Sequence, residues 1–349
     1  MKYSRIGRRG FMHVVGAASF VSPAKAMSRS NSKQKIIFDT DPGIDDAMAL
    51  LFIQKSPVLE LVGITTVAGN GLIDTVTRNT LYLKDRFGIK APIAKGAGPA
   101  LDGSVSPAST RVHGENGLGD ILIPPMSENT LDPRPGWKFI SDIVRQYPGE
   151  VTLVAVGHFT NLAQALRYDP DVVKFVKDVV VMGGAFGFDG YLGNRTPCAE
   201  SNIYGDPIAA DEVFSAQWKV TIVGLDVTMK LPVKFNEIDQ LKQSNDPACQ
   251  LLWAISRKYV NYYRQEGLDH IYIHDAAAVA AAINPELFTR RSGAVRVVTE
   301  GFARGETIQK PDDRHYLISN WDNRPSQSVC IDVDSSKLKN LFFDTILKK

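Results

Sequence analysis

Four aspartates lie close together near the start of the chain, in a pattern that could bind a cation. They are Asp39, Asp41, Asp45 and Asp46. The apolar run at residues 36–38 precedes them and predicts a buried strand. A Pro-Gly turn follows, and then a buried helix over residues 47–53, so the last two acids fall in the first helical turn, where the helix dipole favours negative charge. We therefore expect the four acids to converge at the carboxyl end of a strand.

Carboxylates that lie this close repel one another. At an effective dielectric of about 20, two unit charges 4 Å apart interact by roughly 4 kcal/mol, so a cation is expected between them. Oxygen ligands suit calcium or magnesium rather than zinc, and the run contains no Cys or His. The alternative is a solvated helix N-terminus rich in capping acids. That alternative explains Asp45 and Asp46 but not Asp39 and Asp41, which lie between a buried strand and a turn.

Strand-like and helix-like patterns alternate along the rest of the chain. No low-complexity linker, charge block or internal repeat divides residues 33–349. The alternation predicts a single large α/β domain with a mainly parallel central sheet flanked by helices, a Rossmann-like open sheet whose ligand site lies outside the carboxyl ends of the strands. The predicted strands are residues 60–67, 151–156, 178–182, 219–225 and 294–299, and the predicted helices include residues 75–87, 207–216 and 275–283.

Further polar residues follow the predicted strands. Asn70 closes the segment ITTVAGN, although an Asn in such a turn is more often only turn-forming. Residues 96–135 form a long connection rich in Gly and Pro, which indicates a functional loop or lid. This connection contains His113 in the segment HGENGLGD. On local grounds alone, His113 would be a surface histidine.

Two later blocks add groups suited to sugar hydroxyls or a metal. Met182 ends a predicted strand, and the glycines after it permit close approach of backbone to ligand. The loop beyond them supplies Asn194, Glu200 and Asn202, which could equally belong to an ordinary polar loop. Near the end of the chain, His274 and Asp275 begin an alanine-rich helix. In isolation they would be a core histidine and a helix N-terminal acid.

The segment DTDPGIDDAMAL closely resembles the N-terminal signature of the inosine-uridine preferring nucleoside hydrolases. The resemblance continues through the blocks ITTVAGN, HGENGLGD, VAVGHFTNLAQAL, GNRTPCAESN and IYIHDAAAVAAAINP, and extends from about residue 33 to the C-terminus. It implies calcium-dependent hydrolysis of a ribonucleoside to ribose and free base, in which a metal-bound water attacks through an oxocarbenium-like state without a covalent intermediate. It also implies a homodimer or homotetramer.

The resemblance assigns roles residue by residue. The calcium ligands would be Asp41, Asp46, Asp275 and the backbone carbonyl of Val156. Asp41 would also accept a proton from the attacking water, and Asp45 would help to stabilise the oxocarbenium-like state. Substrate would be held by Asn70, His113, Met182, Asn194, Glu200 and Asn202, with Asn194 and Glu200 on the 5′-hydroxyl and His113 near the base.

The leaving base needs a proton donor, and the resemblance points to His274. A histidine before the last calcium ligand is associated with members that act on inosine and uridine. Tyr259, Tyr262 and Tyr263 lie on a helical segment that could reach the base, although such tyrosine stripes more often belong to a core. Ser201 departs from the family pattern, because well-studied members carry an aromatic residue there.

Two functions from other classes use part of the same pattern. A D-x-D segment after a strand also opens haloacid-dehalogenase-like phosphatases, in which Asp39 would be the nucleophile and magnesium the metal. That interpretation leaves Asp45 and Asp46 unused. Alternatively, a non-catalytic periplasmic nucleoside- or sugar-binding protein would hold the same ligand around a structural calcium.

Residues 1–26 predict a twin-arginine signal peptide. Arg8 and Arg9 precede a short apolar run at residues 11–21, which ends in the A-x-A sequence of residues 24–26. We therefore expect a periplasmic or secreted protein, with no stable membrane association once the signal is removed.

The composition gives no reason to expect a nucleic-acid partner. The whole chain has 40 Lys and Arg against 38 Asp and Glu, and residues 1–26 contribute five of the basic residues and none of the acids. The remaining part is therefore mildly acidic, with 35 basic against 38 acidic residues. The three cysteines, Cys198, Cys249 and Cys330, are far apart and lack metal-like spacing, and one disulfide between them is possible.

Overall fold

The computed structural model describes residues 32–318 and 320–348, and a compact unit begins at Lys33. The predicted signal peptide, residues 1–26, lies outside the described residues. Cys198, Cys249 and Cys330 are all free thiols. Within the described residues, no helix combines the length and apolar character needed to cross a membrane.

A nine-stranded sheet forms the centre of this unit, with strand order β10-β9-β11-β6-β5-β4-β1-β2-β3. Pairing is parallel from β11 through to β3, and antiparallel where β9 joins β10 and β11. The predicted mainly parallel sheet is therefore confirmed. Its strands are β1 (Gln34–Thr40), β2 (Leu59–Thr66), β3 (Ile93–Lys95), β4 (Val151–Ala155), β5 (Asp178–Met182), β6 (Val220–Val223), β9 (Phe288–Val297), β10 (Thr307–Pro311) and β11 (Gln327–Val333).

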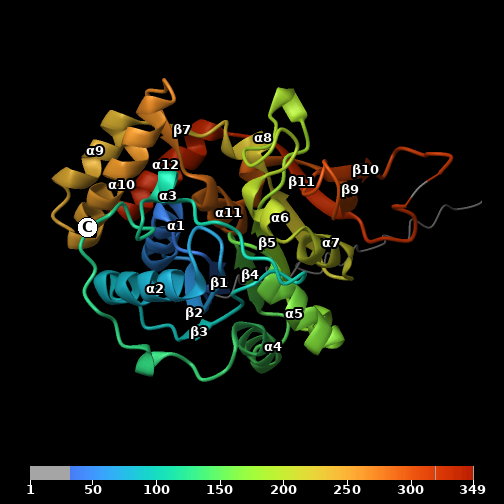
Figure 1. Cartoon of the computed structure of the whole chain (residues 1–349), viewed down its shortest axis with the longest axis horizontal. Coiled ribbons are helices and arrows are strands. Elements are labelled where there is room, and N and C mark those ends of the chain that lie inside the picture. The colour runs from blue at the N-terminus through green and yellow to red at the C-terminus, as the bar shows by residue number, and fades with distance from the viewer. Residues whose placement is uncertain (1–31, 319, 349) are drawn as a thin grey trace, which may run out of the picture. The chain divides into compact units, whose positions relative to one another are not determined.

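Helices cover both faces of the sheet (Figure 1). In β1, Ile36 and Phe38 belong to one hydrophobic cluster and Ile37 to the other, because successive side chains of a strand point to opposite faces. The first cluster packs against α1 (Ile44–Lys55), α2 (Ile73–Phe87), α9 (Phe235–Gln243), α10 (Pro247–Gln265), α11 (His274–Ile283) and α12 (Ser335–Ile346). The second packs against α4 (Gly136–Gln146), α5 (Thr160–Tyr168) and α7 (Pro207–Ser215).

Short elements complete the fold around the ends of the parallel strands. A separate antiparallel pair, β7 (Pro232–Lys234) and β8 (His270–Tyr272), leads directly into α11. The helical segments α3 (Thr110–His113), α6 (Ser201–Gly205) and α8 (Leu225–Thr228) lie in connections that follow β3, β5 and β6. These connections carry the side chains of the candidate site.

The predicted elements match the observed ones best where both faces of a strand are buried. Residues 178–182 coincide with β5, and residues 207–216 differ from α7 at one end only. Residues 294–299 fall largely in β9, which begins earlier and runs antiparallel. We did not predict β10 or β11. Polar residues interrupt the apolar residues of both strands, which gives a weaker apolar pattern in the sequence.

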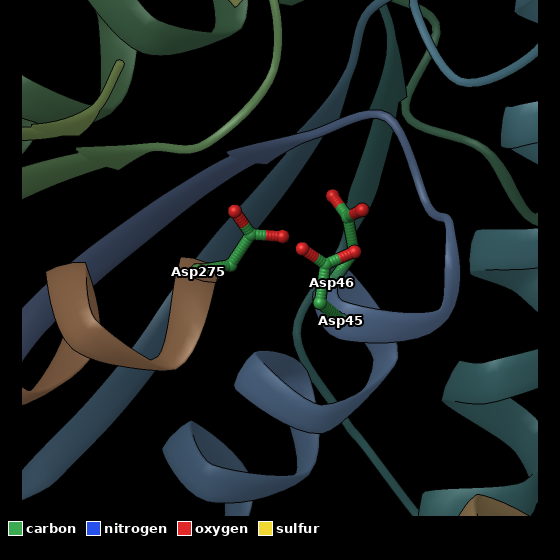
Figure 2. Close-up of side chains that lie close together, drawn as sticks. All are labelled: Asp45, Asp46 and Asp275. Atoms are coloured by element: carbon green, nitrogen blue, oxygen red, sulfur yellow. The ribbon is translucent and has the colours of Figure 1, made fainter. Parts of the chain in front are cut away.

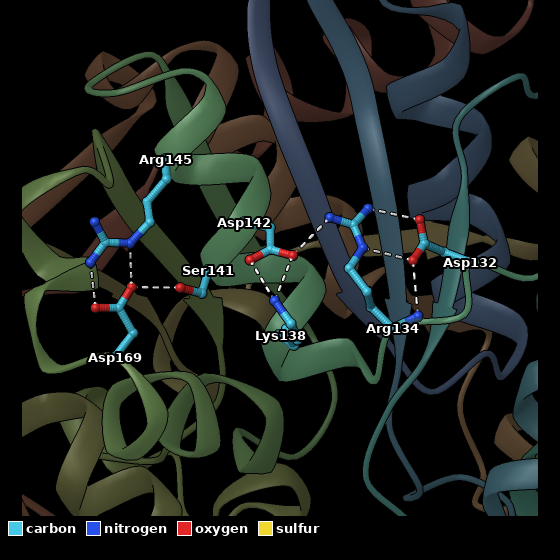
Figure 3. A network of polar contacts seen from close by, with 7 residues as sticks. All are labelled: Asp132, Arg134, Lys138, Ser141, Asp142, Arg145 and Asp169. Atoms are coloured by element: carbon cyan, nitrogen blue, oxygen red, sulfur yellow. Dashed lines mark hydrogen bonds and ion pairs between the residues drawn. The ribbon is translucent and has the colours of Figure 1, made fainter.

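The long connection at residues 96–135 has little regular structure, as predicted, and its end is anchored by the ion pairs of Arg134, which form one of the two groups of contacts in Figure 3. Arg134 bridges Asp132 and Asp142, the second of which lies on α4. Further along α4, Arg145 binds Asp169 at the end of α5. The far end of this connection is therefore tied to helices on the second face, whereas the segment around His113 lies at the candidate site described next.

Candidate active site

A cavity of about 340 Å³ opens at the carboxyl ends of the parallel strands. Its lining includes residues that end or closely follow β1, β2, β4, β5 and β6, namely Asp45, Asn70, Val156, Met182 and Leu225. Loops after parallel strands meet at one edge of the sheet, which explains how residues so far apart in sequence share one cavity. A cavity is therefore present where the sequence led us to expect the ligand site.

Three carboxylates lie close together beside this cavity (Figure 2), and two of them, Asp45 and Asp275, line it. Asp45 and Asp46 belong to the first turn of α1, and Asp275 belongs to the first turn of α11. Each offers an oxygen that lies within 4.8 Å of the oxygens of the other two, and all three side chains are buried. Two helices thus direct their N-termini, which carry partial positive charge, at one acidic group.

Burial makes this acidic group costly to ionise. Loss of solvation raises the pKa of Asp45, Asp46 and Asp275, and for Asp45 and Asp275 the neighbouring negative charges raise it further. A divalent cation would reverse both effects, because it replaces water as the partner of the charged form. The arrangement therefore suits a metal ion bound by oxygen ligands.

Asp41 sits beside this group with one oxygen left unsatisfied. Its Oδ2 accepts a hydrogen bond of 2.7 Å from the backbone N–H of Asn70. Its Oδ1 is buried and has no hydrogen-bond partner. Both oxygens pack against glycine: a Cβ on Gly69 would lie 2.0 Å from Oδ2, and one on Gly157 would lie 2.7 Å from Oδ1. A buried lone carboxylate oxygen is rare unless a ligand completes its bonding. We define Asp41, Asp45, Asp46 and Asp275 as the acid cluster.

Asp46 differs from Asp41 because both of its carboxylate oxygens accept hydrogen bonds. Its Oδ1 accepts from the Thr40 hydroxyl at 2.6 Å, and its Oδ2 accepts from the Gly43 N–H at 2.9 Å and from Asn70 Nδ2 at 3.1 Å. Asn70 therefore contacts two acids at once, through its backbone and its side chain. Gly43 is required here, since a Cβ would lie 2.7 Å from His113 Nδ1.

Asp39 does not join the acid cluster, which corrects the expected convergence of four acids. Its Oδ2 accepts hydrogen bonds from the Thr65 hydroxyl and from Asn161 Nδ2, the latter at 2.7 Å. Burial raises its pKa to about 7 against these hydrogen bonds. The Oδ1 of Asp39 is buried and unpartnered, as that of Asp41 is, but the charge of Asp41, and not that of Asp39, is among those that raise the pKa of Asp275. Residue spacing alone did not reveal that side chains of β2 and α5 would bind this carboxylate.

The carbonyl of Val156 lies near the acid cluster but already accepts a hydrogen bond. Asn202 Nδ2 donates to this carbonyl at 2.7 Å and to the carbonyl of Met182 at 3.1 Å. Asn202 therefore joins the ends of β4 and β5, while its Oδ1 is left to face other groups. A carbonyl oxygen has a second lone pair, so the hydrogen bond leaves Val156 able to bind a metal.

Glu200 is bonded to the backbone on both of its oxygens. Oε1 accepts from the Asn202 N–H at 2.8 Å, and Oε2 accepts from Gly184 and Ile203 at 3.1 Å each. It is the N-cap of α6, and burial raises its pKa to about 6 despite these bonds. Asn194 lines the same side of the cavity and accepts from the Ser201 N–H. Both predicted residues therefore lie at the cavity, with Glu200 also ordering the loop.

Aromatic and imidazole rings form the remaining side of the cavity. We call this side the aromatic wall, and it consists of His113, Tyr259, Tyr262, Tyr263, Tyr272 and His274. His113 stacks on Tyr259 with ring centroids 5.8 Å apart, and its Nδ1 accepts from the Ile44 N–H at 3.1 Å. Burial lowers the pKa of His113 to about 3, so the ring is neutral near pH 7. The segment around His113 is thus docked onto the start of α1.

His274 is held by a residue that the sequence did not single out. Its Nδ1 lies 2.7 Å from the hydroxyl of Thr228, a buried residue of α8. Burial lowers the pKa of His274 to about 4, so this ring is also neutral near pH 7. A neutral imidazole donates from one nitrogen only, and the partner on Nδ1 determines what Nε2 can do.

Three functional candidates were missed by the sequence reasoning. Thr228, Tyr272 and Arg195 all lie at or directly behind the cavity surface, yet none belongs to an unusual local pattern. Tyr272 is two residues before His274, and Arg195 directly follows Asn194. For Tyr272 and Arg195, the one signal in the sequence was their position next to residues that had been predicted, His274 and Asn194.

Comparison with known proteins agrees with this geometry. Residues 36–340 match the family model described as inosine-uridine preferring nucleoside hydrolase. Uridine nucleosidase 1 of Arabidopsis thaliana is 38% identical over 304 residues, which cover 86% of this chain and 89% of that protein. The inosine-uridine preferring nucleoside hydrolase of Leishmania major is 37% identical over 270 residues, covering 77% of this chain and 84% of that protein.

Solved structures give the same result. A plant nucleoside hydrolase superposes with a TM-score of 0.87 at 35% identity, covering 90% of this chain and 99% of that chain. A purine-preferring ribonucleoside hydrolase from Gardnerella vaginalis superposes with a TM-score of 0.82 at 32% identity, covering 90% and 98%. The phosphatase interpretation is wrong, because the matching family model and the relatives are nucleoside hydrolases, and these relatives are enzymes rather than binding proteins. The chain belongs to the inosine-uridine preferring nucleoside hydrolase family and is a nucleoside hydrolase that cleaves the N-glycosidic bond of ribonucleosides.

Proposed function

We propose that this hydrolase requires a calcium ion and that uridine and inosine are among its substrates. The ion would be held by Asp41, Asp46, Asp275 and the carbonyl of Val156. The observation that carries this proposal is the buried, unpartnered Oδ1 of Asp41 beside three converging carboxylates. The choice of substrates is supported by the names of the relatives in Arabidopsis and Leishmania.

The residues present fit a hard cation. All the proposed metal ligands bind through oxygen. Among the described residues, the cluster of side chains that could hold a metal ion consists of aspartates and contains no cysteine or histidine. A bound calcium ion would lower the pKa of water and offer coordination sites to sugar hydroxyls. Bonds from Thr40, Gly43 and Asn70 hold Asp46 in position before any ion binds.

The acid cluster would then carry out the steps on the sugar. Asp41 is placed to accept a proton from the attacking water, because one of its oxygens is fixed by Asn70 and the other is unpartnered. Asp45 would stabilise positive charge that develops on the ribose ring. Asn202, fixed between two strand ends through its Nδ2, would accept from a ribose hydroxyl with its Oδ1.

The aromatic wall would bind the base and assist its departure. Rings at these positions offer flat apolar faces to a nucleobase. His274 is neutral near pH 7, so it would donate from Nε2 if Nδ1 accepts a hydrogen bond from the Thr228 hydroxyl. The Nε2–H would stay on the imidazole and stabilise, by a hydrogen bond, the negative charge that develops on the departing base, and the base would then take its proton from water.

A single assay tests the proposal. Purified protein is incubated with a panel of ribonucleosides, and free ribose is measured before and after exhaustive chelation and again after calcium is restored. We expect release of ribose from uridine and inosine, loss of activity on chelation, and recovery with calcium. Full activity in protein shown by metal analysis to hold no calcium would overturn the calcium requirement.

We also propose that residues 1–26 direct export by the twin-arginine route. The support is the sequence pattern alone, with Arg8 and Arg9 before an apolar run. Replacing both arginines by lysine should retain the protein in the cytoplasm, whereas an equal periplasmic yield would contradict this route. The comparison requires a Gram-negative host and fractionation of cells that express each form.

A further inference from the structure

A buried carboxylate with no part in the proposed function lies on α8, next to Leu225 in the lining of the cavity. It belongs to Asp226, which is fully buried, and burial raises its pKa. A buried charge is costly unless its hydrogen bonds are satisfied, and here the backbone satisfies them. Oδ1 accepts from the N–H of Phe188 at 2.7 Å, and Oδ2 accepts from the N–H of Phe186 at 2.9 Å. Asp226 therefore ties α8 to the loop that follows β5.

The position of α8 depends on such contacts, because the helix is very short. It spans Leu225–Thr228, and no side chain caps its N-terminus. A single turn is not stable alone, so contacts with other elements must set where its side chains lie. Besides those of Asp226, these contacts include a hydrogen bond of 2.8 Å from the N–H of Leu225 to the carbonyl of Gly184. Gly224 packs against the same loop, since a Cβ there would lie 2.8 Å from the carbonyl oxygen of Gly184.

The last residue of α8 reaches the aromatic wall. Thr228 is two positions after Asp226, and its hydroxyl lies 2.7 Å from Nδ1 of His274. Side chains two positions apart on a helix do not face each other, so Asp226 can hold the loop while Thr228 holds the imidazole. A small rotation of α8 would weaken the contact with His274, because hydrogen bonds lose strength steeply with poor distance and angle.

We propose that Asp226 is a positioning residue for hydrolysis, which acts through α8 to hold the Thr228 hydroxyl against His274. This inference rests on the proposed function, in which His274 stabilises the departing base. Hydrogen bonds to an ionised group are roughly twice as strong as neutral ones, so a carboxylate is suited to fix a short helix against a loop. An asparagine would keep the shape and one acceptor oxygen, but it would turn N–H donors toward a backbone N–H group.

The test compares two substrates that differ in what their leaving groups need. The kcat for inosine, divided by the kcat for p-nitrophenyl riboside, is measured for wild type, Asp226→Asn and Thr228→Val. We expect Asp226→Asn to lower this ratio by about 3- to 10-fold, no more than the loss of one hydrogen bond allows. A merely structural role would lower both rates together, or the melting temperature alone. An unchanged ratio in folded Asp226→Asn protein would therefore overturn the inference.

A double variant tests whether Asp226 acts through Thr228. If it does, adding Asp226→Asn to Thr228→Val should lower the ratio no further, because the contact that Asp226 supports is already lost. Losses that multiply would show that the two side chains act independently, and the inference would be wrong.

Asp189→Asn is the matched control, because Asp189 ties the same loop to the residues after α8. It pairs with Lys230 at 2.6 Å, but its side chain is exposed, so the pair contributes little. The ratio should stay within about twofold of the wild-type value. A fall as large as that in Asp226→Asn would mean that any loosening of the loop changes the ratio, which contradicts a specific role for Asp226.

His274→Ala separates this inference from the proposed function. If that variant leaves the ratio unchanged, the role of His274 in the proposed function is wrong, and the inference is wrong with it. If His274→Ala lowers the ratio and Asp226→Asn does not, the inference alone is wrong. If neither Asp226→Asn nor Asp226→Glu yields folded protein, the carboxylate serves the whole fold, and the inference is again wrong.

Discussion

The acid cluster and the aromatic wall face the same cavity, but they are built in different ways. Three of the four acids come from one strand-turn-helix segment, and bonds from Thr40, Gly43 and Asn70 fix Asp46 within it. The aromatic wall is assembled from α3, α10, β8 and α11, whose rings contact each other edge-on or in stacks. A part built on local backbone geometry is held precisely, whereas a part assembled from separate elements can change with any one of them.

The two regions also differ in what anchors them. At the entrance, Arg111 of α3 pairs with Glu266 after α10 at 2.5 Å and lies over the ring of Tyr262. Both charged side chains of that pair are exposed, so the pair contributes little to stability. The acid cluster is buried instead. We infer that the acid cluster supplies the chemistry on the sugar and the aromatic wall selects the base.

The largest expected effect comes from the acid cluster. Asp275→Asn should reduce hydrolysis of every nucleoside by roughly 10³-fold or more, because it removes a metal ligand worth several kcal/mol. It should also abolish the rise in melting temperature caused by calcium. Without calcium, this variant should melt no lower than wild type, since repulsion with Asp45 and Asp46 is relieved.

Asp46→Asn is the matched comparison for that variant. It should lose activity to a similar extent, but it should also melt at a lower temperature in chelator. The reason is that Asp46 accepts hydrogen bonds from Thr40, Gly43 and Asn70, which an amide satisfies only in part. If Asp46→Asn and Asp275→Asn melt at the same temperature in chelator, the hydrogen bonds that Asp46 accepts do not stabilise the fold, and this prediction is wrong.

Removal of the metal should make stability depend on pH in a defined direction. Burial raises the pKa of Asp45 and Asp275 above the value near 3.9 in the unfolded chain, so the folded state binds more protons. Stability of chelated protein should therefore fall as pH rises from about 4 toward these raised values. Melting temperatures at pH 5.5 and 8 should differ clearly in chelator and much less in calcium. The buried His113 and His274 oppose this trend, because their lowered pKa makes the folded state bind fewer protons below about pH 6.5. The decisive comparison is therefore with Asp275→Asn, which should show a smaller fall than wild type over this range in chelator; an equal or larger fall would be inconsistent with the buried acid.

The next effect tests the aromatic wall. His274→Ala should reduce hydrolysis of inosine by about 10²- to 10³-fold, the usual cost of removing one hydrogen-bond donor to charge that develops during the reaction. Hydrolysis of p-nitrophenyl riboside should be largely retained, because that leaving group needs no proton. Equal losses on both substrates would mean that His274 supports Asp275 or positions the sugar. His113 would then be the next candidate for the hydrogen-bond donor to the base, and His113→Ala the variant to measure.

A smaller effect is expected from the residue behind His274. Thr228→Val should lower kcat for inosine by about tenfold, the value of one hydrogen bond, with little change for p-nitrophenyl riboside. Thr228→Ser keeps the hydroxyl and should restore most of the rate. If serine and valine behave alike, the hydroxyl does not orient the ring, and volume rather than hydrogen bonding matters at this position.

The smallest effect is expected at the entrance. Arg111→Ala removes an exposed ion pair and a contact with Tyr262, so stability should change by no more than about 1 kcal/mol. We expect KM for nucleosides to rise a few-fold with kcat nearly unchanged, because in the proposed function this end of the wall would contact the base rather than the sugar. Steady-state kinetics and thermal melting of the same preparation would check both statements.

The amino-acid sequence by itself determined the parts that depend on neighbouring residues. Buried strands such as β5 and the start of α1 follow from short apolar runs, turn residues and helix-favouring acids, all of which act over a few positions. The carboxyl-edge location of Asp45 and Asn70 followed from the alternation of strands and helices. The family resemblance added Asp275 and Val156, which no local pattern connects to the other ligands.

Only the tertiary structure decided which side chains bind which. It separated Asp39 from the acid cluster, because Thr65 and Asn161, from β2 and α5, bind its carboxylate. It also placed Thr228 behind His274, 46 positions away in the chain. Such contacts depend on how helices pack on a sheet and on which strands are neighbours, and packing of this kind leaves no periodic signal in the sequence. For the same reason, Arg195 could be assigned to the lining of the cavity only once the fold was known.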